Sequence, residues 1–215
     1  MARNGAATRT AIMDTAQALI LETGFAATAI DTIIARTGVT KGAFFYHFKS
    51  KTDLAHALIQ RYAANDAAVL ERHLQRAEAL SRDPLQQMLI CFGLFEEDMM
   101  ALDGPYPGCL YASFTYEAQL FGDATMAVVR QVFAGWRARV AGKLHEVAAL
   151  YPPRLPVDID SLADMSLAIA EGAYVVSKVN RDPRAVAVQF RHYRNYLELL
   201  FAPAASALDA PASRA

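Results

Sequence analysis

The apolar positions of this 215-residue chain recur at intervals of three and four along most of its length. Between residues 8 and 23 this spacing is carried by Ile12, Ala16, Leu19 and Ile20, which therefore share one face of an amphipathic helix. Long alternation with a period of two is missing from the sequence, and so are Asn-Gly and Asp-Gly hairpin turns. The pattern predicts an all-α protein.

Three short helices are predicted within the first 50 residues. Gly24 follows the first of them at the position of a C-terminal cap. Thr28 and Asp31 have the spacing of a capping box and predict the start of the second helix, which Gly38 ends. Thr40 is placed to cap the third helix. Three short helices in close succession suggest a helix-turn-helix unit, whose second helix enters the major groove of DNA.

The remainder of the chain predicts a larger helical body. Ser50 and Asp53 form another capping box, which opens a long helix running to about residue 80. Proline after aspartate at residues 83–84 and 182–183 marks two further helix starts. The later helices are expected near 84–102, 108–121, 123–150, 158–180 and 183–201. We therefore expect a DNA-binding domain over 1–50, a second domain over 51–202, and a disordered tail over 203–215.

Composition and charge narrow the function. Hydrophobic residues make up 54% of the chain, enough to bury a core, and the net charge of −1 argues against a general nucleic-acid binder. The charge is uneven, because residues 1–55 carry six Lys/Arg against four Asp/Glu, whereas the rest is net acidic. A mildly basic head on an acidic body permits DNA binding by the head.

The sequence gives no sign of export, membrane insertion or catalysis. It contains no apolar run long enough to span a bilayer, no signal-peptide pattern and no CxxC pair, so we expect a cytoplasmic protein. Nucleophile-elbow, zinc-protease and phosphate-loop motifs are all missing from the sequence. We expect neither an enzyme nor a metal or cofactor site.

The stretch TGVTKGAFFYHFKSKTDL, residues 37–54, holds five consecutive rings between lysines. On a helix, Phe44 and Phe48 lie four residues apart and share the face that anchors the third helix to the other two. The side chains of Phe45, Tyr46 and His47 then point elsewhere, toward the surface that would face DNA. The row of rings thus predicts two faces of one helix, a buried face with Phe44 and Phe48 and an outer face with Phe45, Tyr46 and His47.

This stretch resembles the signature of the TetR family of bacterial transcriptional repressors, Gly-Val-Ser/Thr-x-Gly-x-Leu/Phe-Tyr-x-His-Phe, and ETGFAATAIDTIIARTGV, residues 22–39, is similar to the helix and turn before it. The chain departs from the signature at Phe45, where the family usually has a tyrosine. The resemblance implies a ligand-responsive repressor with an all-α fold. The DNA contacts that it implies are Thr28, Thr40, Lys41, Gly42, Ala43, Phe45, Tyr46, His47 and Lys51.

The resemblance also implies that the body binds a small-molecule effector. Residues 88–136 are rich in aromatics and methionine, which form adaptable apolar pockets as well as ordinary cores. Placed on the helices that the family uses as pocket walls, the expected effector contacts are Phe95, Met99, Phe114, Glu117, Trp136 and Tyr174. We expect an apolar or aromatic effector and take the long helix from Ser50 as the only rigid link from pocket to head.

The resemblance further implies that the last two helices pair with a second copy of the chain, and such a symmetric dimer suits a palindromic operator in double-stranded DNA. Small residues at 170, 172 and 173 permit close approach, and the apolar stripe over 186–200 serves either this pairing or packing within the chain. Two alternative functions stay open. One is a thiol-sensing repressor that uses Cys109, and the other is a helical small-molecule binding protein that no longer binds DNA.

Overall fold

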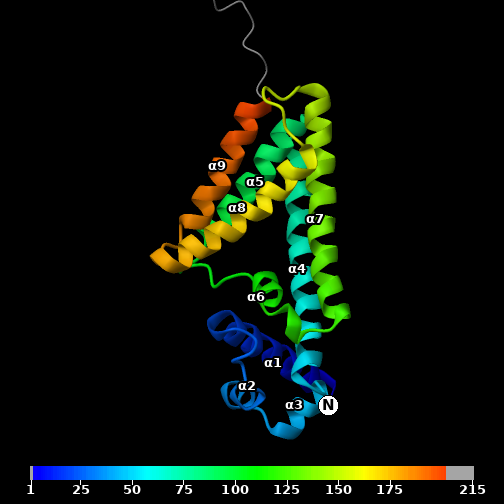
Figure 1. Cartoon of the computed structure of the whole chain (residues 1–215), viewed down its shortest axis with the longest axis vertical. Coiled ribbons are helices and arrows are strands. Elements are labelled where there is room, and N and C mark those ends of the chain that lie inside the picture. Colours follow the sequence, from blue (N-terminus) through cyan, green and yellow to red (C-terminus); the bar gives the residue numbers. More distant parts are fainter. Residues whose placement is uncertain (1, 202–215) are drawn as a thin grey trace, which may run out of the picture.

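The computed structural model describes the backbone of residues 2–201 and the side chains of residues 5–201. The predicted disorder of 203–215 lies outside the described residues. Over the described range the chain forms nine α-helices and one short 3-10 turn, with no β-strand. The expected all-α fold is confirmed. The helices form a small head at one end of an elongated body (Figure 1).

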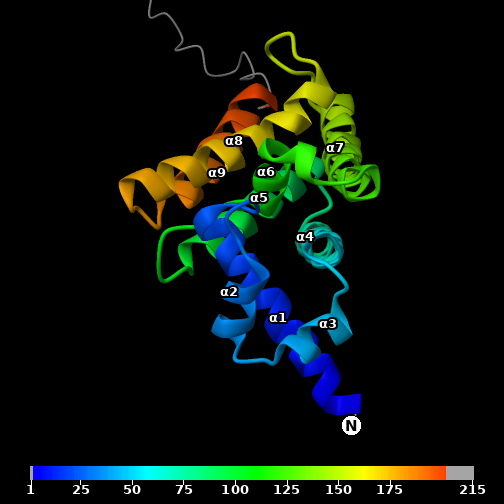
Figure 2. The ribbon, with the colours of Figure 1, turned by 60° about the horizontal axis from the view of Figure 1, so that its bottom comes forward.

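The head contains α1 (Ala2–Thr23), α2 (Ile30–Thr37) and α3 (Lys41–His47). Gly24 and Gly38 end the first two helices with φ values of 85° and 73°, a left-handed conformation that glycine adopts without strain. Gly24 and Gly38 thus end the first two helices at the positions predicted from the sequence. Figure 2 shows the three helices gathered below the body, with α4 (Lys51–Leu80) leading from the head into it.

Thr28 does not start α2. The helix begins at Ile30, with Ala29 as an N-cap that offers no side-chain acceptor, and the Thr28 hydroxyl donates instead to the Gly24 carbonyl at 2.8 Å. The expected capping box is therefore wrong, because Thr28 faces back toward the end of α1. The caps at Thr40, Ser50 and Asp83 are confirmed, since each side chain accepts a backbone N–H from the first turn of its helix.

The body is built from long helices beside α4. They are α5 (Pro84–Met100), α7 (Asp123–Leu150), α8 (Ile159–Asn180) and α9 (Ala185–Phe201), with α7 running alongside α4 and α9 packing on both α5 and α8 (Figure 1). The last helix starts two residues later than expected, because the Asp182 carboxylate accepts from the Arg184 N–H and forms a turn ahead of it. The apolar stripe Val186, Phe190, Tyr193, Leu197 and Leu200 is buried inside the body.

A short helix, α6 (Leu110–Tyr116), followed by a 3-10 turn at Ala118–Leu120, lies between body and head. Its Leu110 and Phe114 side chains are buried in the same hydrophobic cluster as Phe44 and Phe48 of α3. Leu54 and Leu58 from the first turns of α4 complete that cluster. The core of the head thus continues past residue 50 and includes residues that are distant in sequence.

Candidate nucleic-acid interface and effector cavity

The five rings of α3 divide as the helical spacing predicts. Phe44 and Phe48 are fully buried, whereas Tyr46 is 83% exposed and Phe45 is 41% exposed. His47 is half-buried, with its ring centroid 4.9 Å from that of Tyr46. The arrangement leaves two aromatic side chains on the outer surface of a helix whose inner face is fixed in the core.

The beginning of α3 is also accessible. Thr40, Lys41 and Gly42 are exposed, and Ala43 is half-buried. The Thr40 hydroxyl accepts from the Ala43 N–H at 3.1 Å, and the Lys41 ammonium lies 3.9 Å from the Asp31 carboxylate, too far for a strong ion pair. Polar and cationic groups therefore stand beside the exposed rings, as a helix that docks against DNA requires.

Two residues expected to touch DNA are instead engaged within the head. Thr28 is only 2% exposed and its hydroxyl is already hydrogen-bonded, so it cannot reach a phosphate. The Lys51 ammonium donates to the carbonyls of Phe25 and Thr28 at 2.7 and 2.9 Å and lies over the Phe25 ring. Burial lowers the pKa of Lys51, partly offset by Glu117. We correct both assignments to structural roles, because Thr28 is held by a local bond to Gly24 and Lys51 by bonds to a turn 23 to 26 residues away in sequence.

The turn between α1 and α2, residues 24–29, is also held from the body. The Glu117 carboxylate, at the end of α6, accepts from the N–H groups of Phe25 and Ala26 at 2.8 and 2.7 Å. Together with Lys51, which binds the carbonyls of the same turn, Glu117 forms what we call the head clamp. Glu117 was expected in the effector pocket, and this expectation is wrong, because its two oxygens are committed to the head.

An internal cavity of about 220 Å³ lies in the body, lined by residues from α4 to α9 and from the loop before α6. Rings dominate its wall, which is formed by Tyr62, Phe95, Tyr106, Tyr111, Phe133, Trp136, Tyr174 and Phe190, with Met99 and Cys109 among the other lining residues. The Tyr106 and Tyr174 rings stack with centroids 4.0 Å apart. A largely apolar cavity with a few polar groups is the usual form of a small-molecule site.

Acidic side chains supply the charge in this cavity. Asp66 on α4, Asp98 on α5 and Glu171 on α8 all line it, and among the described residues no lysine, arginine or histidine does. Burial raises the pKa of Asp66 to about 6, the adjacent Tyr111 hydroxyl partly offsets this rise, and the nearby Glu171 adds to it. Burial also raises the pKa of Glu171. Both carboxyls thus sit where a negative charge is poorly solvated.

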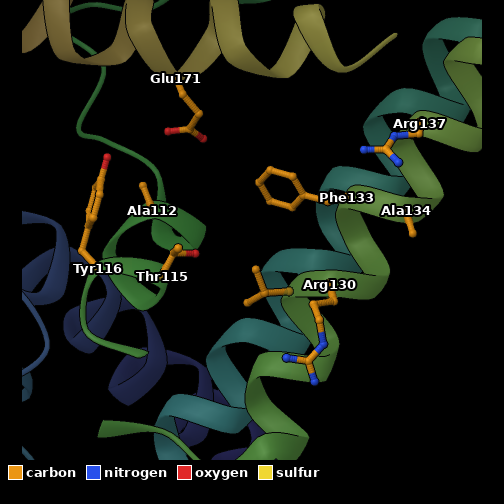
Figure 3. A pocket seen from close by; sticks show the side chains of 9 residues that line it. Ala112, Thr115, Tyr116, Arg130, Phe133, Ala134, Arg137 and Glu171 are labelled. Atoms are coloured by element: carbon orange, nitrogen blue, oxygen red, sulfur yellow. The ribbon is translucent and has the colours of Figure 1, made fainter. Parts of the chain in front are cut away.

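A wider surface groove of about 500 Å³ adjoins the cavity. It shares Phe133 and Glu171 with the cavity wall and is otherwise formed by residues of α6 and α7. Figure 3 shows Phe133 from α7 and Glu171 from α8 directed into the same space, opposite Tyr116 and Thr115 of α6. These two shared side chains mark the boundary through which a ligand would pass from the groove to the cavity.

Comparisons with known proteins agree on one family. The profile of bacterial regulatory proteins of the tetR family matches residues 12–58, which include α2, α3 and the start of α4. Transcriptional regulator AcuR of Cereibacter sphaeroides is 28% identical over 164 residues, covering 76% of this chain and 73% of the relative. The chain belongs to the TetR family.

Further relatives extend the likeness over the whole fold. The HTH-type transcriptional repressor DhaR of a Mycobacterium species is 27% identical, covering 77% of this chain and 80% of that one. The crystal structure of a TetR transcriptional regulator from Chloroflexus aurantiacus is 26% identical with a TM-score of 0.72, covering 92% of this chain and 98% of that one. The chain is thus a TetR-family transcriptional regulator, in both its head and its body.

The residues expected in the effector pocket of this TetR-family protein fall into two groups. Phe95, Met99, Trp136 and Tyr174 line the cavity. Phe114, by contrast, packs into the core of the head with its ring 4.3 Å from that of Phe121, and it is corrected together with Glu117. Both corrected residues lie on or just after α6, a helix whose opposite faces serve the head and the body.

The acids and most of the tyrosines of the cavity were not predicted from the sequence. Glu171 carried a usable signal, because it is the only charged residue between Asp164 and Lys178. A single acid within an apolar helical stretch indicates a buried carboxylate. Asp66 carried no such signal, since its neighbours on α4 are polar or small and its cavity-facing position depends on where α6 and α8 pack.

Neither cysteine has the setting of a reactive thiol. Cys91 is buried and its pKa is raised to about 12 by burial. Burial also raises the pKa of Cys109, and the adjacent Glu171 carboxyl adds to the rise. A thiol-sensing site needs cationic or dipolar stabilisation of the thiolate and access to oxidant. The surroundings of Cys109 therefore disfavour the thiol-sensing alternative.

Proposed function

We propose that this TetR-family regulator is a homodimeric repressor that leaves a palindromic operator when a small aromatic effector fills the internal cavity. The observation that carries the proposal is the position of α6: Tyr111 of this helix and Cys109 at its N-cap line the cavity, and Glu117 at its C-cap forms the head clamp. A ligand that displaces α6 therefore acts on the turn that precedes α2.

Within the described residues, no helix is long and apolar enough to span a membrane.

The DNA-binding surface that we propose consists of the exposed end and outer face of α3. It contains Thr40, Lys41, Gly42, Ala43, Phe45, Tyr46 and His47. Lys41 and Thr40 are suited to phosphate, the Ala43 methyl to a thymine methyl, and Tyr46 to the phosphate contact that the tyrosine usual at position 45 would make. Two such surfaces, related by the dimer axis, would read two half-sites.

Replacing Lys41 by alanine is expected to weaken binding to operator and to random DNA alike, because a phosphate contact carries no sequence information. The slope of log affinity against log salt concentration should become shallower by about one for each protomer. Fluorescence anisotropy with DNA from upstream of its own coding region, at several salt concentrations, measures both. Lys49→Ala is the matched control, since Lys49 is exposed beyond the end of α3. Unchanged binding in Lys41→Ala would contradict this docking of α3.

The dimer interface that we propose is the outer face of α8 with that of α9. The stripe over 186–200 is used inside the chain, so the surface left for a partner carries other residues. On α8 it is apolar and exposed at Met165, Val175, Val176 and Val179, and Gly172 lies among them. Leu199 adds an exposed apolar side chain on α9. An apolar two-helix face of this kind suits a symmetric pairing of helices.

Placing a charge on this face is expected to separate the protomers. Val175→Glu would bury an unpaired carboxylate at the proposed interface, so the variant should elute as a monomer and lose operator affinity. Size-exclusion chromatography with light scattering measures the mass. Leu80→Glu, which alters an equally exposed apolar residue at the end of α4, is the control and should remain dimeric. A dimeric Val175→Glu protein would place the interface elsewhere.

A further inference from the structure

The cavity combines a ring of aromatic side chains with carboxylates that have no cationic partner. Among residues 5–201, neither Asp66 nor Glu171 forms an ion pair, whereas Asp98 at the edge of the cavity lies 3.1 Å from the His73 imidazole. The Tyr111 hydroxyl, beside Asp66, is buried and finds no well-formed hydrogen bond within the same residues. Both carboxylates are half-buried, and a carboxylate withdrawn from water without a cationic partner is costly, so an incoming cation would reduce that cost.

The rings around these acids are of the kind that bind organic cations. Tyr62, Tyr111 and Tyr174 come from α4, α6 and α8, Tyr106 comes from the loop before α6, and Trp136 of α7 lines the same cavity. The faces of such rings attract organic ammonium groups, most strongly where water is excluded. A metal ion is a poor fit, because the described residues contain no group of three or more His, Cys, Asp or Glu arranged to hold one.

The size of the cavity limits the ligand. At about 220 Å³ it exceeds the ~150 Å³ of a protein cavity that holds benzene. The additional space admits one aromatic ring with a short side chain. An aromatic ring would pack against Phe95, Trp136 and Phe190, and the side chain would lie toward the acids.

We propose that the effector is a small aromatic organic cation whose ammonium group is held between Asp66 and Glu171. The proposal rests on the proposed function, since it names the chemical class that fills the same cavity. Of the cavity and the adjoining groove, only the groove is lined by arginines, namely Arg137, which donates to Asp164, and the exposed Arg130. The competing ligand class is an aromatic anion bound at that groove. The experiment below therefore also titrates an aromatic anion.

The test uses the full-length protein and the fluorescence of Trp136, its only tryptophan. Phenethylammonium is titrated beside its neutral counterpart 2-phenylethanol and the anion 3-phenylpropanoate. The cation should bind about tenfold more tightly than the alcohol, and the anion more weakly than both. Asp66→Asn and Glu171→Gln should each reduce the preference for the cation over the alcohol. Glu97→Gln, the same change at an exposed site outside the cavity, should leave it intact.

A pH series on the unmodified protein gives a readout that does not depend on any variant folding. As pH falls from 8 to 5, protonation of Asp66 should weaken binding of the cation and leave binding of the alcohol unchanged. The other titratable groups facing the site are Glu171, Asp98 with its partner His73, Cys109 and the tyrosines Tyr62, Tyr106, Tyr111 and Tyr174. Of these, only the carboxyls and His73 have ordinary pKa values below 8.

Three results would overturn the cation assignment: equal affinity for the alcohol, tightest binding of the anion, or no fluorescence response to phenethylammonium. Operator binding is measured separately on the same samples. Release of operator by the alcohol or the anion would retain the repressor function with a different ligand class. Failure of the ligand-free protein to bind operator would instead reject the proposed function itself.

Discussion

Replacing Phe44 by alanine is expected to lower the free energy of unfolding by about 3–5 kcal/mol, the usual cost of truncating a buried phenylalanine. Phe44 is fully buried, and its ring is 6.1 Å from that of Phe48 and 5.3 Å from that of Phe45. The core that it anchors is shared with α4 and α6, so the cavity left behind would loosen α3 from both. Because α3 has only seven residues, it has little stability of its own.

Chemical denaturation, with hydrogen exchange followed over residues 10–60, measures the size and location of this effect. Phe45→Ala is the matched control. It removes the same ring from the next position, which is exposed, and should cost roughly 0.5 kcal/mol or less while still weakening DNA binding. A Phe44→Ala protein of nearly normal stability would contradict the division of α3 into anchor and contact faces.

Replacing Glu117 by alanine is expected to loosen the turn between α1 and α2. The variant loses two hydrogen bonds from backbone N–H groups to a carboxylate, and a single bond of this type contributes about 1.5–3 kcal/mol. Loss of one such contribution from the local opening free energy would speed amide exchange at Phe25 and Ala26 by about 10- to 150-fold. Lys51 would also lose the nearby negative charge that favours its ammonium form.

The same substitution tests how the cavity communicates with the head. The long α4 helix was expected to be the only rigid link, but the head clamp provides a second link through α6. If a ligand acts through α6, Glu117→Ala should remove most of a coupling that is typically 1–3 kcal/mol in allosteric proteins. The ratio of operator affinities with and without phenethylammonium measures that coupling.

Glu22→Ala is the control for this experiment. Its carboxylate forms an exposed ion pair with Arg36 on the surface of the head, so its loss should leave both amide exchange in the turn and the coupling unchanged. Glu117→Gln retains one carbonyl acceptor and should fall between the alanine variant and the unmodified protein. Normal exchange at Phe25 and Ala26 in Glu117→Ala would show that Glu117 does not hold the turn, and an unchanged coupling would show that α4 alone transmits the signal.

Much of the molecule follows from local pattern. The periodicity of apolar residues determined the helices and most of their ends, because capping by Thr40, Ser50 and Asp83 depends on residues three or four positions away. The division of α3 into Phe44 and Phe48 inside and Phe45 and Tyr46 outside follows from the same helical geometry. The motif in residues 37–54 identified the family before any packing was known.

Only the tertiary structure decided what the polar side chains do. Lys51 has the sequence position of a DNA contact, yet its bonds to the turn between α1 and α2 direct it inward, and Thr28 in that turn is buried. Glu117 is 91 and 92 residues from the backbone groups that it binds, and Asp66, Tyr111 and Glu171 meet in one cavity from three different helices. Helical periodicity fixes which face a residue occupies, but the partner of that face depends on how distant helices pack.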